Sequence, residues 1–265
     1  MGVFMFDASR FDPTGRFTGL ADTYAKHRPG YPDAALDYIM QRCGLSSASR
    51  LVDVGCGTGI SSRLFAAHGI PVIGIEPNDE MRARAEAEVL PGGLPAPAYR
   101  KGTAEATGLA DGFADAALAA QAFHWFKADE ALREFHRVLR PQGHVALIWN
   151  ERNERDACTA AFGAVMRSGP DAAAVEVPRG RAGEALLQHP LYLDASRVVF
   201  TNEQELDEEG LLGRAFSASY APREPAAAER FAEALRDVFA RYGRSGKVVL
   251  RYETSVYVAQ RKELV

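Results

Sequence analysis

The feature that most constrains this chain is a short apolar run that ends in three closely spaced glycines. Residues 51–59 read LVDVGCGTG. The apolar run predicts a buried strand, and the spacing after it predicts a helix that begins at a Thr58 N-cap and ends at Gly69. We expect Gly55, Gly57 and Gly59 to let the backbone approach a ligand where side chains would collide with it.

The start of that helix suits a ligand with a carboxylate or phosphate, because it offers unpaired N–H groups and the positive end of the helix dipole. A dinucleotide-binding turn reads G-x-G-x-x-G, which would require a glycine where this chain has Ile60. A P-loop would require Gly-Lys-Ser/Thr, and no lysine is present here. A tight turn without a ligand is the simpler alternative, but it would not need three entropically costly glycines.

The string VDVGCGTG, residues 52–59, resembles motif I of the class I S-adenosylmethionine-dependent methyltransferases. This resemblance implies that S-adenosyl-L-methionine is the cofactor and that the three glycines hold its methionine end. It also assigns Asp53 and Thr58 to the cofactor site.

A second buried strand, residues 71–76, ends in the acid Glu76 about 20 residues after the glycines. In nucleotide-binding α/β folds an acid at this place accepts hydrogen bonds from the two ribose hydroxyls. A glutamate exposed at a strand end is the alternative. Pro77 and Asn78 open a helix that runs to about Val89, and the resemblance implies that Pro77 and Met81 flank the adenine.

A third strand, residues 98–101, leads into Thr103, Ala104 and Glu105. Many methyltransferases carry Asp-Ala here, with the acid on the adenine amino group, so Thr103 is a departure from the family. Thr103 and Glu105 are candidates to replace that acid. The backbone amide of Ala104 is expected to read the adenine edge whatever the side chain.

A fourth strand, residues 115–121, ends at Gln121 and is followed directly by AFHWF at residues 122–126. If the sheet is parallel, these aromatics lie over the cofactor site. Imidazole and indole have polar ends that require partners. The string resembles the A-x-H-W-F signature of a subgroup that includes trans-aconitate methyltransferase-like proteins. We therefore predict catalytic roles for His124, the one candidate base, and Trp125, with Gln121 in the cofactor site.

The segment YAKHRPGYP, residues 24–32, resembles the Y-x-x-x-R-P-x-Y-P stretch that helps cover the cofactor in the same subgroup. From spacing alone, an interface between two surface helices is an equal alternative. The predicted cofactor-binding residues are Tyr24, Arg28, Asp53, Gly55, Gly57, Thr58, Gly59, Glu76, Pro77, Met81, Thr103, Ala104, Glu105 and Gln121.

The remaining pattern predicts an α/β fold with a doubly wound, seven-stranded, mostly parallel sheet. An amphipathic helix over 128–139 and a tight turn at 140–143 precede a fifth strand at 145–149. Helix 151–166 and a loop at 168–190 interrupt the pattern and predict a helical cap, whose Arg152, Arg155, Arg179 and Arg181 are either ordinary surface charges or contacts for an acidic substrate. Strand 195–201, helices 205–217 and 225–243 and an antiparallel last strand at 248–260 follow.

We accordingly divide the chain into four parts. Residues 1–45 are an N-terminal arm and helices over the cofactor site, and 46–150 are the S-adenosylmethionine-binding core. Residues 151–193 are the cap insertion, and 194–265 complete the sheet.

Composition narrows the class of protein. The chain has 265 residues, 47% of them hydrophobic and 25% charged, and a net charge of −4, which does not favour nucleic acid as a partner. Three cysteines without a C-x-x-C motif predict neither a disulfide framework nor a metal site and fit the cytoplasm. We see neither a signal peptide nor an apolar run long enough to span a membrane. We expect a monomer or homodimer.

The sequence thus predicts a methyltransferase that acts on a small molecule, with a carboxylic acid as one candidate acceptor. In-line methyl transfer mainly requires positioning, and a general base is optional. Two alternatives stay open. A non-enzymatic S-adenosylmethionine-binding sensor is weakened by the lack of an appended DNA-binding module, and a nicotinamide-dependent oxidoreductase by the early third glycine.

Overall fold

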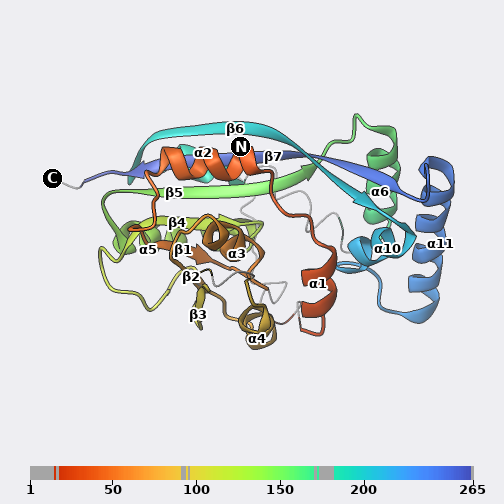
Figure 1. The fold of residues 1–265 in the computed structure, drawn as a ribbon, viewed down its shortest axis with the longest axis horizontal. Helices are drawn as coiled ribbons and strands as arrows, with labels where there is room; N and C mark the ends of the chain where they lie inside the picture. Colours follow the sequence, from red (N-terminus) through yellow and green to blue (C-terminus); the bar gives the residue numbers. More distant parts are fainter. Residues whose placement is uncertain are drawn as a thin grey trace, which may run out of the picture.

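A seven-stranded sheet forms the centre of the molecule (Figure 1). The structure is a computed structural model that describes residues 15, 18–90, 94, 96–169, 172 and 182–263. The expected N-terminal arm, apart from Gly15, therefore lies outside the described residues, and so do Arg179 and Arg181. The strands are β1 (Leu51–Val54), β2 (Val72–Ile75), β3 (Ala98–Arg100), β4 (Ala114–Ala120), β5 (Leu139–Arg152), β6 (Tyr192–Leu206) and β7 (Val248–Arg261).

The strand order is β3-β2-β1-β4-β5-β7-β6. Neighbours from β3 to β5 are parallel, whereas β7 runs antiparallel to both β5 and β6. This confirms the predicted mostly parallel sheet with an antiparallel last strand. In a parallel sheet of this kind, ligands bind beyond the carboxyl ends of the strands near the point where the strand order reverses, here between β1 and β4.

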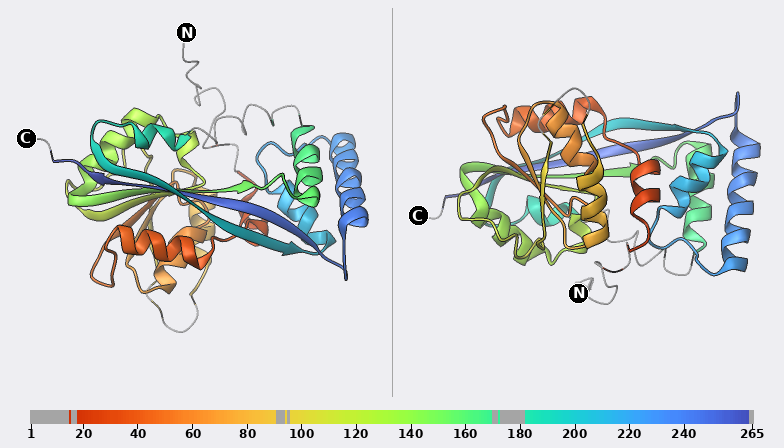
Figure 2. Two further views of the ribbon diagram at one scale, coloured as in Figure 1. Left: turned by 90° about the horizontal axis from the view of Figure 1, so that it is seen from above. Right: turned by 60° about the horizontal axis from the view of Figure 1, so that its bottom comes forward.

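Helices cover both faces of the sheet (Figure 2). One face packs against α5 and α9, and the other against α2 and α3. The middle strands can be buried on both sides because they are almost wholly apolar, as the run in β1 shows. The helices near the parallel part of the sheet are α1 (Ala21–His27), α2 (Asp33–Arg42), α3 (Ile60–Ala67), α4 (Asp79–Ala87), η4 (Phe123–Trp125), α5 (Ala128–Val138) and α9 (Glu184–Leu187).

A separate helical layer sits at the far end of the long strands β5, β6 and β7 (Figure 1). It consists of α6 (Ala157–Arg167), α10 (Glu208–Phe216) and α11 (Pro225–Tyr242), which share one apolar cluster with the ends of β6 and β7. We call these three helices the cap. They come from both sides of the predicted boundary at residue 193, and the four-part division of the chain stays a prediction.

Three elements expected at this end of the chain are present with different bounds. The helix predicted from residue 151 begins at Ala157, because β5 keeps pairing with β7 as far as Arg152, opposite Tyr252, and Asp156 then caps the helix by accepting from the Thr159 amide. The strand predicted at 195–201 extends over Tyr192–Leu206, and the helix predicted from 205 begins at Glu208.

The tight turn predicted at 140–143 is instead a bulge within β5. Ala114 pairs with Leu139 and Ala116 with His144, so the intervening residues loop out without ending the strand. Gln142 takes a left-handed conformation there, with φ of 63°.

Several features of the described ranges bear on the class of protein. None of their helices combines the length and apolar character that crossing a membrane requires. Within the same ranges, no group of three or more histidine, cysteine, aspartate or glutamate side chains is arranged to hold a metal ion. Cys43, Cys56 and Cys158 are all free and buried.

Candidate functional site

The glycine turn between β1 and α3 is left-handed at all three glycines, with φ of 68° at Gly55, 56° at Gly57 and 76° at Gly59. Packing inside the protein is a further reason for glycine at two of these positions. A Cβ at Gly55 would lie 2.8 Å from Ala122 Cβ, and one at Gly59 would lie 2.9 Å from the Tyr99 ring. Two of the three glycines therefore admit close protein packing, and Gly57 alone keeps a looser fit, 3.4 Å from Met81 Cε.

Thr58 is not the N-cap of α3, because Gly59 occupies that position. The Thr58 side chain is instead buried, and its hydroxyl has no hydrogen-bond partner among the described residues. A left-handed residue directly before the helix places Thr58 one step too early to cap it.

Asp53 lies in β1 just before the turn and is fully buried. Its Oδ2 accepts hydrogen bonds from the Ser61 and Ser62 hydroxyls, both at 2.6 Å, while Oδ1 has no hydrogen-bond partner within the described part of the chain. Burial raises the pKa of Asp53 to about 6, against the lowering effect of those two hydroxyls. A buried acceptor without a donor is costly, so Oδ1 is suited to a donor from a ligand.

Glu76 connects the ends of the first two strands. Its Oε2 accepts from the Gly57 amide and its Oε1 from the Asn78 amide, both at 2.9 Å. Burial raises the pKa of Glu76, and those two amides oppose the shift. Each carboxylate oxygen has two acceptor directions, so one on each oxygen is left for a pair of hydroxyls.

The residues predicted for the adenine surroundings follow β2 and β3. Met81 and Ala104 are buried and Pro77 is half-buried. The Thr103 hydroxyl accepts from the Ala106 amide, and Glu105 accepts from the Lys127 amide at 2.9 Å. Both polar side chains already stabilise the local loop, which leaves the backbone at Ala104 as the simpler adenine contact.

His124 and Trp125 form the short helix η4 directly after β4. His124 is 6% exposed, and its Nδ1 accepts a hydrogen bond from Trp149 Nε1 at 3.4 Å. An imidazole that accepts at Nδ1 carries its proton on Nε2 when it is neutral. A neutral His124 with this contact therefore carries a donor at Nε2, and its expected role as a base stays a prediction.

Gln121 ends β4 in a left-handed conformation, with φ of 57°. Its amide donates to Ile148 O at 2.8 Å, and its side chain donates to Asn150 O at 3.3 Å. Gln121 thereby turns the chain from β4 into η4 and fixes where His124 lies.

Tyr24 and Arg28 approach from α1. The Arg28 guanidinium stacks 4.5 Å over the Tyr24 ring and donates to Ser217 O of the cap at 3.1 Å. Burial raises the pKa of Tyr31 well above its usual value, and the nearby Tyr24 and Asp53 raise it further. The arginine-proline segment therefore reaches the end of β1, and Tyr31 lies with the residues predicted there.

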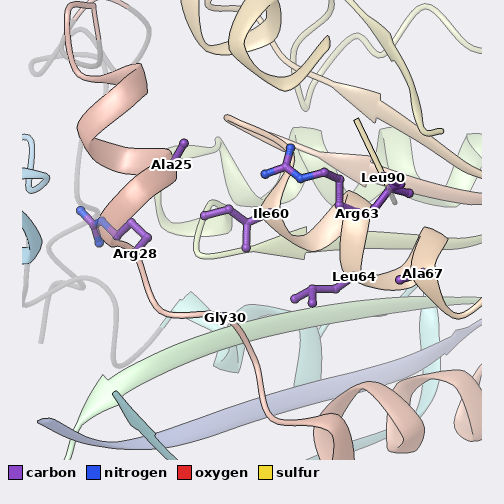
Figure 3. Close-up of a pocket in the computed structure, with 8 residues that line it drawn as sticks. All are labelled: Ala25, Arg28, Gly30, Ile60, Arg63, Leu64, Ala67 and Leu90. Carbon is purple, nitrogen blue, oxygen red and sulfur yellow. The ribbon is translucent and has the colours of Figure 1, made fainter. Parts of the chain in front are cut away.

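An open hollow of about 290 Å³ lies between α1 and the outer side of α3 (Figure 3). Arg63 extends toward α1 and donates to Thr58 O at 2.7 Å, whereas Arg28 points away toward the cap. The lining of this hollow includes neither Glu76 nor His124. The hollow therefore lies beside the glycine turn and is separate from the predicted site around Glu76 and His124.

The structure brings the ends of β1, β2 and β4 together at one edge, through the Gly57–Glu76 hydrogen bond and the packing of Gly55 on Ala122. It leaves Arg155 apart, with an 89% exposed side chain beside Glu253. Sequence reasoning missed Tyr99 and the partnership of Trp149 with His124, since neither residue stands inside a recognisable motif.

Comparisons with known proteins indicate which proteins this chain is similar to. Residues 52–147 match the family of methyltransferase domains. An uncharacterized methyltransferase of Mycobacterium tuberculosis is 35% identical over 158 residues, which are 60% of this chain and 61% of that protein. A ubiquinone biosynthesis O-methyltransferase of Pseudomonas aeruginosa is 31% identical over 49% of this chain and 56% of its own length. The chain thus spans less than two thirds of these relatives.

A solved structure extends the similarity to the whole fold. A protein from Anaeromyxobacter dehalogenans described as a type II methyltransferase has 25% identity and a TM-score of 0.60. The match covers 89% of this chain and 97% of that one.

Proposed function

We propose that this chain is a class I S-adenosylmethionine-dependent methyltransferase and that it transfers a methyl group from S-adenosylmethionine to a small molecule. A carboxylic acid is the candidate class of acceptor. The observation that carries the proposal is the hydrogen bond from the Gly57 amide to Glu76. It brings an acid suited to the two ribose hydroxyls next to the glycine turn that is proposed to bind the methionine end of the cofactor.

The residues fit the cofactor on two counts. Asp53 Oδ1 is a buried acceptor without a donor, which suits the ammonium of an amino acid. Glu76 keeps one acceptor direction on each oxygen for ribose hydroxyls. We therefore propose that these two acids, the glycine turn, Tyr24 and Arg28 hold the cofactor, with Met81 and Ala104 beside the adenine.

When bound, S-adenosylmethionine supplies an electrophilic methyl group together with its leaving group. The task of the chain is to hold the acceptor in line and dry, which is worth up to roughly 7–11 kcal/mol in reactions of this kind. His124 would donate its Nε2 proton to the acceptor and hold its orientation. Trp125, together with the apolar cluster of the cap against which it packs, would exclude water.

Binding calorimetry tests the cofactor half of this proposal. Glu76→Ala is expected to weaken S-adenosylmethionine binding by about 1–3 kcal/mol, because hydrogen bonds to a charged acceptor are lost. Glu86→Ala is the matched control, since Glu86 is exposed on the same segment of the chain. An unchanged dissociation constant for Glu76→Ala would remove this acid from the site, and binding of NAD in place of S-adenosylmethionine would favour an oxidoreductase.

Transfer of a labelled methyl group into a panel of small acids, phenols and amines tests the catalytic half. An enzyme gives a labelled product with at least one class of acceptor, whereas a sensor binds the cofactor and labels none of them. His124→Ala is expected to slow turnover more than it weakens cofactor binding, and the reverse pattern would assign His124 to the cofactor.

The proposal includes location and assembly. The three free, buried cysteines support a reducing compartment, and we propose the cytoplasm. Cell fractionation tests the location. Light scattering coupled to gel filtration tests the expected monomer or homodimer.

A further inference from the structure

One arginine of the cap is buried and has no counter-ion among the residues that the structure describes. Arg214 lies on the inner side of α10 and is 6% exposed. Its one hydrogen bond within the described ranges runs from Nε to the Tyr252 hydroxyl at 3.3 Å. No carboxylate among the described residues forms an ion pair with it. Arg137, by contrast, pairs with both Glu134 and Asp111 at the surface.

Burial of a guanidinium carries a large desolvation cost that a fold normally offsets with a carboxylate or several acceptors. A tyrosine hydroxyl offsets little of it, and the two terminal nitrogens of Arg214 gain nothing from that contact. Such an imbalance is expected where a ligand supplies the missing negative charge, because binding sites keep groups that folding alone would not favour.

The surroundings of Arg214 hold it in one orientation. Tyr252 accepts from Arg214 and donates to Gln204 Oε1 at 3.2 Å, so its hydroxyl is used in both directions. In the β5–β7 ladder Tyr252 stands opposite Arg152, whose side chain is 12% exposed. Directly opposed residues point to the same face of a sheet. A second guanidinium therefore lies on the same side of the sheet, with Glu154 3.7 Å from its Nε.

This region adjoins the predicted reaction centre. Trp125 follows His124 directly and packs against the same apolar cluster that contains Tyr252. From the other side, Arg28 donates to Ser217, which lies at the carboxyl end of α10. Figure 2 shows α1 next to α10, between the core and the rest of the cap. Arg214 is thus held in the part of the cap that adjoins α1 and the apolar cluster contacted by Trp125.

We propose that Arg214 anchors a carboxylate of the methyl acceptor, and that the acceptor is consequently a small organic acid bound between the cap and His124. The proposal rests on the proposed function and adds to it a residue that selects the substrate class. Planar carboxylates match the two terminal nitrogens of a guanidinium, and a lysine at this position would supply charge without that geometry.

The first test is the stability of the unliganded protein. Arg214→Met replaces an uncompensated buried cation by an apolar chain of similar length, so its melting temperature is expected to equal or exceed that of the parent. Arg223→Met is the contrast, because Arg223 donates to the Phe216 and Ala218 carbonyls and its loss should lower the melting temperature. A clear destabilisation by Arg214→Met would overturn the proposal in favour of a purely structural role.

The second test uses ligands on the full chain. Thermal shift is measured with succinate, tricarballylate and benzoate, with inorganic phosphate, and with succinamide as the uncharged analogue. At least one carboxylate should stabilise the parent and succinamide should not. The dissociation constant of that carboxylate should rise at least tenfold in Arg214→Met and less in Arg214→Lys. Arg236 is an exposed arginine of α11, and Arg236→Met should leave this dissociation constant unchanged. Stabilisation by phosphate alone, equal binding to Arg214→Met, or no carboxylate effect in the parent would each overturn the inference.

Calorimetry with S-adenosylmethionine separates this inference from the proposed function. The Arg214→Met variant should bind the cofactor as the parent does. If only cofactor binding falls, Arg214 holds the cofactor carboxylate and the acceptor proposal is wrong. If the parent itself does not bind S-adenosylmethionine, the proposed function fails, while the carboxylate measurements still decide the role of Arg214.

Discussion

Substituting Gly59 by alanine tests whether the glycine turn is fixed by packing inside the protein. Two costs are expected. A left-handed conformation costs a non-glycine residue about 1–2 kcal/mol. The new Cβ would also meet the Tyr99 hydroxyl and lie 2.9 Å from the ring carbon that bears it, and relief of such a collision in a packed site costs about 1–3 kcal/mol. The expected loss of unfolding free energy is therefore about 2–5 kcal/mol.

Gly69 at the other end of α3 isolates the first of these costs. It has φ of 79°, close to the 76° of Gly59, and a Cβ there would meet no atom within 4 Å. Urea unfolding should thus show a loss of about 1–2 kcal/mol for Gly69→Ala, and the surplus for Gly59→Ala measures the collision with Tyr99.

A double variant locates the collision. Tyr99→Phe removes the hydroxyl, so Gly59→Ala should cost less in that background than in the parent, with a coupling energy above about 0.5 kcal/mol. Equal losses for Gly59→Ala and Gly69→Ala would refute this reasoning. The glycine would then be required for its conformation or for the ligand alone, as the sequence first indicated.

Two further predictions concern polar groups of the site. Burial raises the pKa of Asp53 from 3.8 to about 6, so ionising this side chain costs the folded state roughly 3 kcal/mol as the pH rises from about 4 through 6. Asp53→Asn should therefore be more stable than the parent at pH 7.5 and lose that advantage at pH 4.5. Urea unfolding measures both stabilities, and the same difference between variant and parent at the two pH values would contradict this prediction. Nitrogen NMR of His124 should show a neutral ring protonated at Nε2, and Trp149→Phe should admit the Nδ1-protonated form, whereas a parent ring already protonated at Nδ1 would contradict the Trp149 hydrogen bond.

The core could be predicted because its signals are local. A buried apolar run, glycines at fixed spacing and an acid at the next strand end were enough to place Glu76 beside the glycine turn. The prediction for β7 succeeded for the same reason, since its alternating apolar residues indicate a strand, although residues 254–259 are buried on both faces of the sheet.

The edge strand and the cap depended on partners far away in the sequence. The residues of β6 from Thr201 to Glu205 are exposed or half-buried polar residues, and they form a strand because β7 pairs with them. Arg152 ends a strand, where the sequence predicted the first turn of a helix, because it pairs with Tyr252 of β7. Arg214 looked like any charged residue of an amphipathic helix, and only tertiary packing reveals that it is buried.

The position of β7 between β5 and β6 affects how the protein is made. On the ribosome, residues 139–206 emerge well before residues 248–261. The edges of β5 and β6 that pair with β7 therefore stay unpaired until β7 has been synthesised. Pairing at such sequence separation is slow, and an unpaired edge invites association with other chains. Chaperone dependence during synthesis should therefore be greatest in the interval after β6 has emerged and before β7 has, a period that ribosome-bound chains of increasing length would expose.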